Sequence, residues 1–128
     1  MATIKSYTDI SQSKKLAKIL SLESADMWHH GFFTPNRMCK IEYNPPTPYH
    51  SVTHQWDCPC WSLAALISIL PKNLNIGRPS LESNYKGYYW IQYYDGFMKP
   101  NNYRTKCFNN PVDACVEMII KLYEVKLI

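Results

Sequence analysis

The sequence predicts an α+β protein in which about three helices pack on a small antiparallel sheet, all within a single domain of residues 1–128. Three observations lead to this class. An amphipathic pattern near the C-terminus indicates a helix, an aromatic run that ends in a turn indicates paired strands, and an apolar run between two prolines indicates a further helix. With 46% hydrophobic and 19% charged residues, 128 residues are enough for one core and too few for two ordinary domains.

The first predicted helix follows Asp9 or Thr8, either of which can cap a helix N-terminus, and it runs to Leu20. A proline-rich irregular loop is expected later, at about residues 29–57, with one strand-like run from Met38 to Tyr43. A long irregular segment in a compact domain is usually either a functional loop or a poorly ordered one. The sequence does not distinguish the two.

The central segment, residues 57–71, places two cysteines around a proline directly before an apolar run. Pro59 suits the first position of a helix, where its missing N–H costs no hydrogen bond, and Pro71 limits the continuation of that helix. Because the run is apolar on nearly all sides, we expect this helix to be the buried element against which the others pack.

Aromatic residues that favour strands dominate residues 87–94, and Asp95-Gly96 supplies a turn towards a second strand between Tyr103 and Phe108. Side chains alternate along a strand, so positions 89, 91 and 93 can pack beneath the helices. The other face, together with a nearby basic residue, is the predicted interaction surface: Tyr88, Trp90, Tyr94 and Arg104. Such a face suits a protein partner or, as an alternative, single-stranded nucleic acid whose bases stack on the rings.

The last predicted helix has the clearest signals. Asn110 is a good N-cap and Pro111 occupies the first helical position. Apolar residues then recur at spacings of three and four, and acidic and basic residues occupy the opposite side. We therefore expect one face of this helix to pack on the sheet.

Three segments carry a resemblance to other proteins: residues 21–27 (SLESADM), 59–66 (PCWSLAAL) and 110–122 (NPVDACVEMIIKL). They resemble a group of short uncharacterised proteins of gut bacteria, often found in phage-like or mobile regions. The similarity covers most of the chain except the proline-rich loop. It implies a bacterial or phage intracellular origin, and it transfers no catalytic or binding residue.

Two cysteines and the loop histidines are weak candidates for chemistry. Cys60 at a helix N-terminus would have a lowered pKa and could act as a nucleophile. Its base would be His54 or another upstream histidine: His29, His30 or His50. Cys60-Trp61 resembles the active-site segment of papain-type cysteine proteases, but that family has its histidine downstream, and none follows His54 here. The other hypothesis is a zinc site, for which Cys-x-Cys is an unusual spacing: His50, His54, Cys58 and Cys60. We prefer buried structural thiols to both, with no catalytic residue and no metal.

Charge and cysteine content indicate which functional classes and which cellular compartment fit the chain. The net charge of +4 is weaker than expected for a dedicated nucleic-acid binder, and five cysteines, an odd number, fit reduced thiols in a cytoplasmic protein. No apolar window is long enough for a membrane span. We expect a non-catalytic protein-interaction module without a cofactor, with an unknown protein partner, no membrane association and an undetermined oligomeric state. A cysteine- or zinc-dependent activity and single-stranded nucleic-acid binding are the alternatives.

Overall fold

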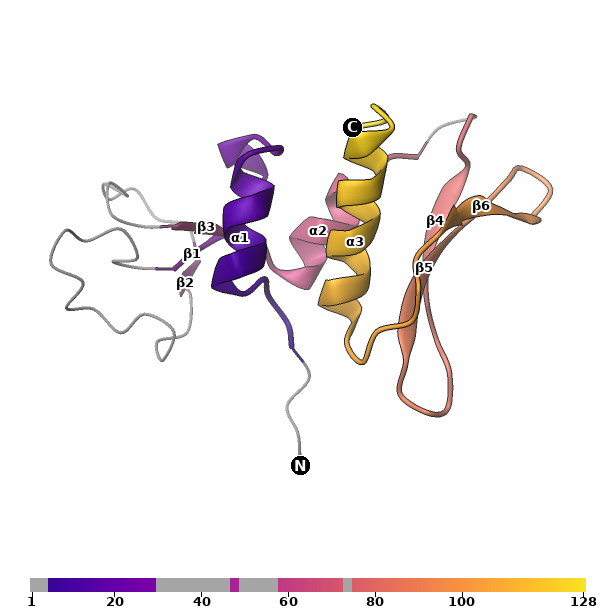
Figure 1. The fold of residues 1–128 in the computed structure, drawn as a ribbon, viewed down its shortest axis with the longest axis horizontal. Helices are drawn as coiled ribbons and strands as arrows, with labels where there is room; N and C mark the ends of the chain where they lie inside the picture. Colours follow the sequence, from indigo (N-terminus) through magenta and orange to yellow (C-terminus); the bar gives the residue numbers. More distant parts are fainter. Residues whose placement is uncertain (1–4, 30–46, 49–57, 73–74) are drawn as a thin grey trace, which may run out of the picture.

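The computed structural model of the protein describes residues 5–29, 47–48, 58–72 and 75–128 (Figure 1). Within these residues the elements form three layers: a small sheet, a middle layer of helices and a larger sheet. Both sheets are antiparallel, so the α+β class predicted from the sequence is confirmed. The strands form two separate sheets, however, where a single small sheet was expected.

The small sheet has the strand order β2-β1-β3 among the described residues. It consists of β1 (Met27–His29), β2 (Thr47–Pro48) and β3 (Cys58–Cys60). In the register of β1 and β3, Trp28 faces Pro59. Pro59 has no N–H to donate to a neighbouring strand. A sheet tolerates this in β3, because β3 is an edge strand.

The middle layer begins with α1 (Ile10–Ala17) and the short 3-10 turn η1 (Leu22–Ser24). Asp9 is the N-cap of α1 and forms a capping box with Gln12, which confirms one of the two predicted caps. The next helix is α2 (Leu63–Ile69), and the last is α3 (Pro111–Glu124). Asn110 caps α3 through a hydrogen bond from Asp113 N–H, and Pro111 is its first residue, as predicted.

The larger sheet has the order β4-β5-β6 and contains β4 (Arg78–Ser83), β5 (Tyr89–Tyr94) and β6 (Pro100–Arg104). Gly77, directly before β4, has a φ of +86°, and a Cβ atom there would lie 2.1 Å from the carbonyl oxygen of Tyr94. A residue with a side chain would strike the backbone of β5, so the close approach of the two strands requires glycine at this position.

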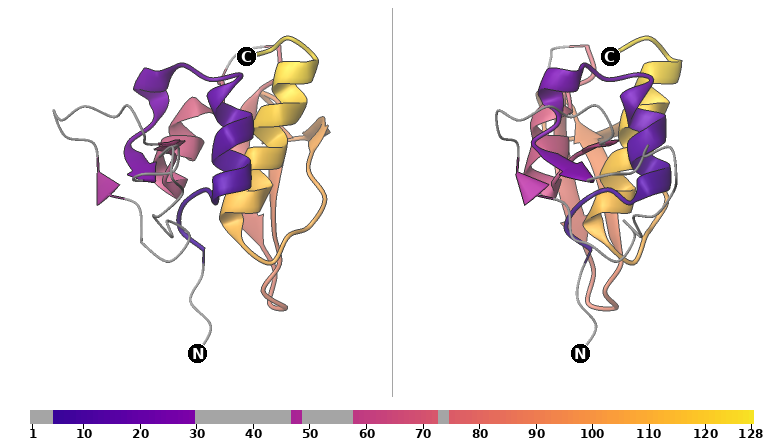
Figure 2. Two further views of the ribbon diagram at one scale, coloured as in Figure 1. Left: turned by 60° about the vertical axis from the view of Figure 1, so that its left-hand side comes forward. Right: turned by 90° about the vertical axis from the view of Figure 1, so that its left-hand side faces the viewer.

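The hydrophobic core surrounds α3, which contacts α2 on one side and β5 on the other. Figure 2 shows α1 beside α3 in both views, and the two helices are in contact. The core includes fully buried side chains from α3 and from each of these neighbours: Leu16, Leu66, Ile91, Tyr93, Cys115 and Ile119. Helix α3 is therefore the element that joins the two halves of the chain.

The expectation for the central helix is wrong in two respects. Its first residue is Leu63 rather than Pro59, because Pro59 pairs with β1 and Ser62 provides the N-cap. It is also not buried on most sides: Ile67 is 40% exposed. The most buried helix is α3.

Two further expectations are changed. The second strand after the Asp95-Gly96 turn is β6, not a strand from Tyr103 to Phe108, although Phe108 forms an isolated bridge with Tyr89. The segment at about 29–57 is not irregular throughout. Its first residue, His29, belongs to β1, and residues 47–48 within it form β2. The run from Met38 to Tyr43 lies outside the described residues.

In the part of the chain that the structure describes, no helix has the length and apolar character needed to cross a bilayer.

Candidate functional site

A cluster of small polar and sulfur side chains, the thiol cluster, is buried where α1 packs against β3: Thr8, Ser13, His29, Cys58 and Cys60. Thr8 is its centre. The Thr8 hydroxyl lies 2.8 Å from Ser13 Oγ and accepts the N–H of Trp61 at 3.1 Å. The Thr8 carbonyl oxygen lies 2.9 Å from His29 Nε2 and 3.4 Å from Cys60 Sγ. These bonds tie β1, β3 and the start of α1 together.

The electrostatic setting of the two thiols disfavours the thiolate. Burial raises the pKa of Cys58 to about 11, and the neighbouring Cys60 adds to the increase. Burial also raises the pKa of Cys60, although hydrogen bonds from Thr8 and Ser13 act in the opposite direction. Cys60 lies in a strand, and the N-cap of α2 is Ser62, so the helix N-terminus expected to activate this thiol is not beside it.

The two chemical hypotheses also include histidines, and the structure does not place the three that follow His29 relative to the thiol cluster. Cys39 lies outside the described residues, and so do these three histidines: His30, His50 and His54. Among the residues that the structure does place, no three His, Cys, Asp or Glu side chains come together in a way that could hold a metal ion. Cys58 and Cys60 are both fully buried, which fits their interpretation as structural thiols.

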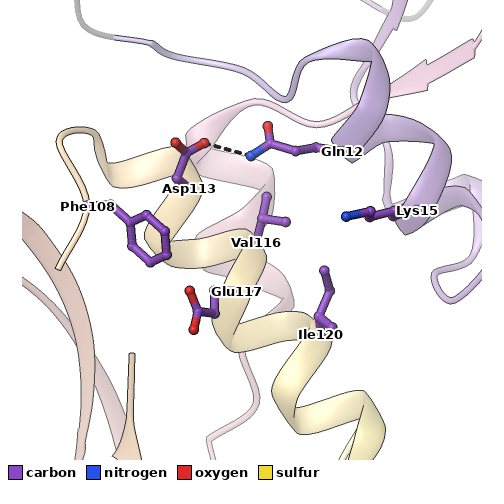
Figure 3. A pocket seen from close by; sticks show the side chains of 7 residues that line it. All are labelled: Gln12, Lys15, Phe108, Asp113, Val116, Glu117 and Ile120. Atoms are coloured by element: carbon purple, nitrogen blue, oxygen red, sulfur yellow. Dashed lines mark hydrogen bonds between the residues drawn. The ribbon is translucent and has the colours of Figure 1, made fainter. Parts of the chain in front are cut away.

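A shallow groove of about 340 Å³ lies between α1 and α3 (Figure 3), and its walls carry both polar and apolar side chains: Gln12, Lys15, Phe108, Asp113, Val116, Glu117 and Ile120. Asp113 is already bound, because it accepts hydrogen bonds from Gln12 Nε2 at 2.6 Å and Lys5 Nζ at 2.9 Å. Its carboxylate is therefore engaged in joining α1 to α3, and the groove offers few unbound polar groups at that end.

The strongest candidate is the side of the larger sheet that faces away from α3, which we call the outer face. Register places Glu82 opposite Trp90 and Arg78 opposite Tyr94, and these pairs alternate with the buried Ile91 and Tyr93. The central row between them pairs Ser80 with Gln92. Directly opposite residues of neighbouring strands share one face of a sheet, so these side chains form a single surface.

Glu82 joins the two aromatic residues of the outer face. Its carboxylate accepts a hydrogen bond from Trp90 Nε1 at 2.9 Å and another from the Tyr94 hydroxyl. On the outer face, the pair of Ser80 and Gln92 separates Tyr94 from Glu82. The Tyr94 side chain therefore extends past the buried Gln92 to reach the Glu82 carboxylate. The hydrogen bond to Glu82 raises the pKa of Tyr94, because it favours the protonated phenol.

Three of the five basic residues in segment 78–108 lie over aromatic rings rather than beside carboxylates. The Arg104 guanidinium is 5.2 Å from the ring centre of Trp90, the Lys86 ammonium is 5.9 Å from that of Tyr85, and Lys106 is 5.6 Å from Phe108. Within the described residues no ion pair joins any basic residue of segment 78–108 to a carboxylate. The rings hold these cations without neutralising them.

Large apolar side chains stand at both ends of the outer face. Tyr85 in the β4–β5 turn is 93% exposed, and Phe97 in the β5–β6 turn is 86% exposed. Met98 beside Phe97 is exposed as well. None of the described helices or strands lies over this side of the sheet, whereas α3 covers the other side (Figure 1). A face with this much exposed aromatic surface is unusual on a protein that binds nothing.

The structure brings together three of the four residues predicted for the interaction surface. Trp90, Tyr94 and Arg104 meet around one network, and Tyr88 lies beside it at the turn before β5, 44% exposed. Sequence reasoning missed Glu82, because β4 was not predicted. The signal was a turn centred on Asn84, whose side-chain oxygen accepts the N–H groups of Lys86 and Tyr88.

Comparison of the chain with protein-family models, curated proteins and solved structures finds no match. Functional assignment therefore depends on the geometry of the chain itself.

Proposed function

We propose that the protein is a non-catalytic interaction module of bacterial or phage origin that binds a protein partner in the cytoplasm through the outer face. One observation carries the proposal: Trp90, Tyr94 and Arg104 form an ordered network that no described element covers. Trp, Tyr and Arg are the residue types that contribute most to protein–protein affinity. Their side chains are held in place before binding, which lowers the entropy cost of association.

A protein fits this face better than single-stranded nucleic acid does. Stacking platforms for bases need free ring faces and positive surroundings. Here Arg104 already lies over Trp90, and the carboxylate of Glu82 is bound between the two aromatic residues. A base could stack on that face of Trp90 only by displacing Arg104.

The proposal is tested by site-specific photo-crosslinking in the native host. Tyr88 and Tyr123 are both 44% exposed, but Tyr123 lies on α3, the helix on the opposite side of the sheet from the outer face. Each is replaced in turn by the photoreactive residue p-benzoylphenylalanine. We expect a discrete protein adduct at position 88, its loss when Trp90→Ala is added, and no such adduct at position 123.

The same adducts at both positions, or none at position 88, would reject the outer face as a binding surface. Circular dichroism of the Trp90→Ala variant serves as the folding control. Persistence of the adduct in that variant would show that the partner binds elsewhere.

A further inference from the structure

We infer that the segment of the partner that docks on the outer face is acidic, with apolar side chains between its carboxylates. This inference rests on the proposed function and names the chemistry of the partner. It starts from the distribution of charge along the chain. Residues 78–108 contain five basic and two acidic residues, a net charge of +3, whereas the whole chain has +4. Nearly all the excess positive charge therefore belongs to the larger sheet and its turns.

The two acidic residues of this segment are engaged by neutral donors. Glu82 accepts from Trp90 and Tyr94, and Asp95 accepts the backbone N–H groups of Phe97 and Lys99 at 2.8 and 3.0 Å. Neither carboxylate neutralises a cation, so the positive charge remains available to a partner. Arg78 and Arg104 lie exposed on either side of the network.

The cations and rings of the outer face are complementary to a peptide segment in which carboxylates alternate with apolar side chains. Carboxylates of the partner would pair with Arg78 and Arg104, and Lys99 lies at the β5–β6 turn beyond them. The apolar groups would contact the parts of the Trp90 and Tyr94 rings that remain accessible beside Arg104, and the exposed side chain of Phe97. Complementary charge of this kind sets the choice of partner and speeds association more than it raises affinity.

A second copy of the chain fits the outer face poorly. A symmetric dimer through this face would bring the same surface of both copies together. Each copy would then place its positive residues 78–108 against those of the other, with no free carboxylate to compensate. Like charges in direct contact disfavour such a dimer.

The test uses fluorescence anisotropy with labelled peptides. One short peptide alternates Glu and Asp with Phe and Leu, and its counterpart has Lys at every acidic position. We expect the acidic peptide to bind at least about tenfold more tightly at low salt and to weaken as the salt concentration rises. Arg104→Glu should weaken it by about tenfold, while Lys18→Glu, the same charge change on an exposed residue after α1, should change binding by less than about twofold.

Three results would overturn the inference: equal binding of the two peptides, equal loss in the Arg104→Glu and Lys18→Glu variants, or displacement of the acidic peptide by a labelled thymidine oligonucleotide that binds more tightly. Mapping the crosslink formed at position 88 separates this inference from the proposed function. A discrete adduct on a neutral or basic segment overturns the acidic inference and leaves the interaction module standing, whereas an absent adduct rejects both.

Discussion

Trp61 and Trp90 make the same hydrogen bond in opposite surroundings. Each indole N–H donates to a side-chain oxygen at 2.9 Å, Trp61 to Ser24 and Trp90 to Glu82. Trp61 is fully buried beside the thiol cluster, while Trp90 is half-buried on the outer face beneath an arginine. The comparison teaches that residue type and hydrogen bonding do not separate a core residue from a residue on an open face; burial and the neighbouring charges do.

The largest expected effect separates the two tryptophans by stability. Trp61→Ala should lower the free energy of unfolding by about 3–5 kcal/mol, because it leaves a large cavity in the core. Trp90→Ala removes a half-buried ring and should cost about 1 kcal/mol. Urea denaturation of both variants measures the difference. Equal losses would contradict the assignment of Trp90 to a binding surface.

Thiol reactivity sharpens the same comparison. Cys107 is exposed, whereas Cys58, Cys60 and Cys115 are buried, and burial raises the pKa of Cys115 to about 12. Iodoacetamide should label Cys107 at least about a hundredfold faster than the three buried thiols, because those react only after local opening. Peptide mapping by mass spectrometry follows each site separately, and denatured protein, in which all sites should react alike, is the control. Rapid labelling of Cys60 would revive the nucleophile hypothesis.

The smallest expected effect is on the pH dependence of stability, and it concerns a cation bound by carboxylates rather than by an aromatic ring. Lys5 pairs with Asp9 and Asp113 at 2.9 Å each, whereas Arg104 of the larger sheet lies over the ring of Trp90. Burial alone would raise the pKa of Asp113, but hydrogen bonds from Lys5, Asn110 and Gln12 outweigh it and lower the pKa. A carboxyl with a lowered pKa stabilises the fold fully above the pKa of the unfolded chain, about 4, and this contribution is lost as the pH falls through the lower folded value.

Asp113→Asn should therefore cost about 1 kcal/mol at pH 7, and its stability should approach that of the wild type at about pH 3. Urea denaturation across this range measures the convergence. Glu117→Gln on the same helix, whose carboxylate makes no described ion pair, is the matched control and should change stability little at either pH. A gap between Asp113→Asn and the wild type that does not change with pH would contradict the ionic role of Asp113.

Sequence signals were sufficient where local chemistry decides the structure. The Asn110-Pro111 start predicted the beginning of α3, and alternation separated the buried Ile91 and Tyr93 from Trp90. Asp9 was one of two predicted caps of α1, which ends at Ala17 rather than at Leu20. Sequence signals failed where pairing between distant segments decides. Pro59 fits a helix start as well as an edge strand, and only its pairing with Trp28 selects the strand.

The candidate site was predictable in part for the same reason. Trp90 and Tyr94 follow from the alternation within one strand, but their link through Glu82 depends on the register of β4. That strand reads Arg-Pro-Ser-Leu-Glu-Ser, which has too little apolar alternation to be recognised as a strand. Burial of Cys60 beside Thr8 joins residues fifty-two positions apart, and no local pattern encodes such a contact.

The position of α3 between α2 and β5 has a consequence for synthesis in the cell. The larger sheet is translated before this helix, so the side of that sheet that α3 covers stays bare until the residues of α3 have been made. Nascent chains with exposed apolar surface bind chaperones and associate with one another. A chain truncated after Asn109 should therefore aggregate more readily than one truncated after Glu124, which keeps all of α3.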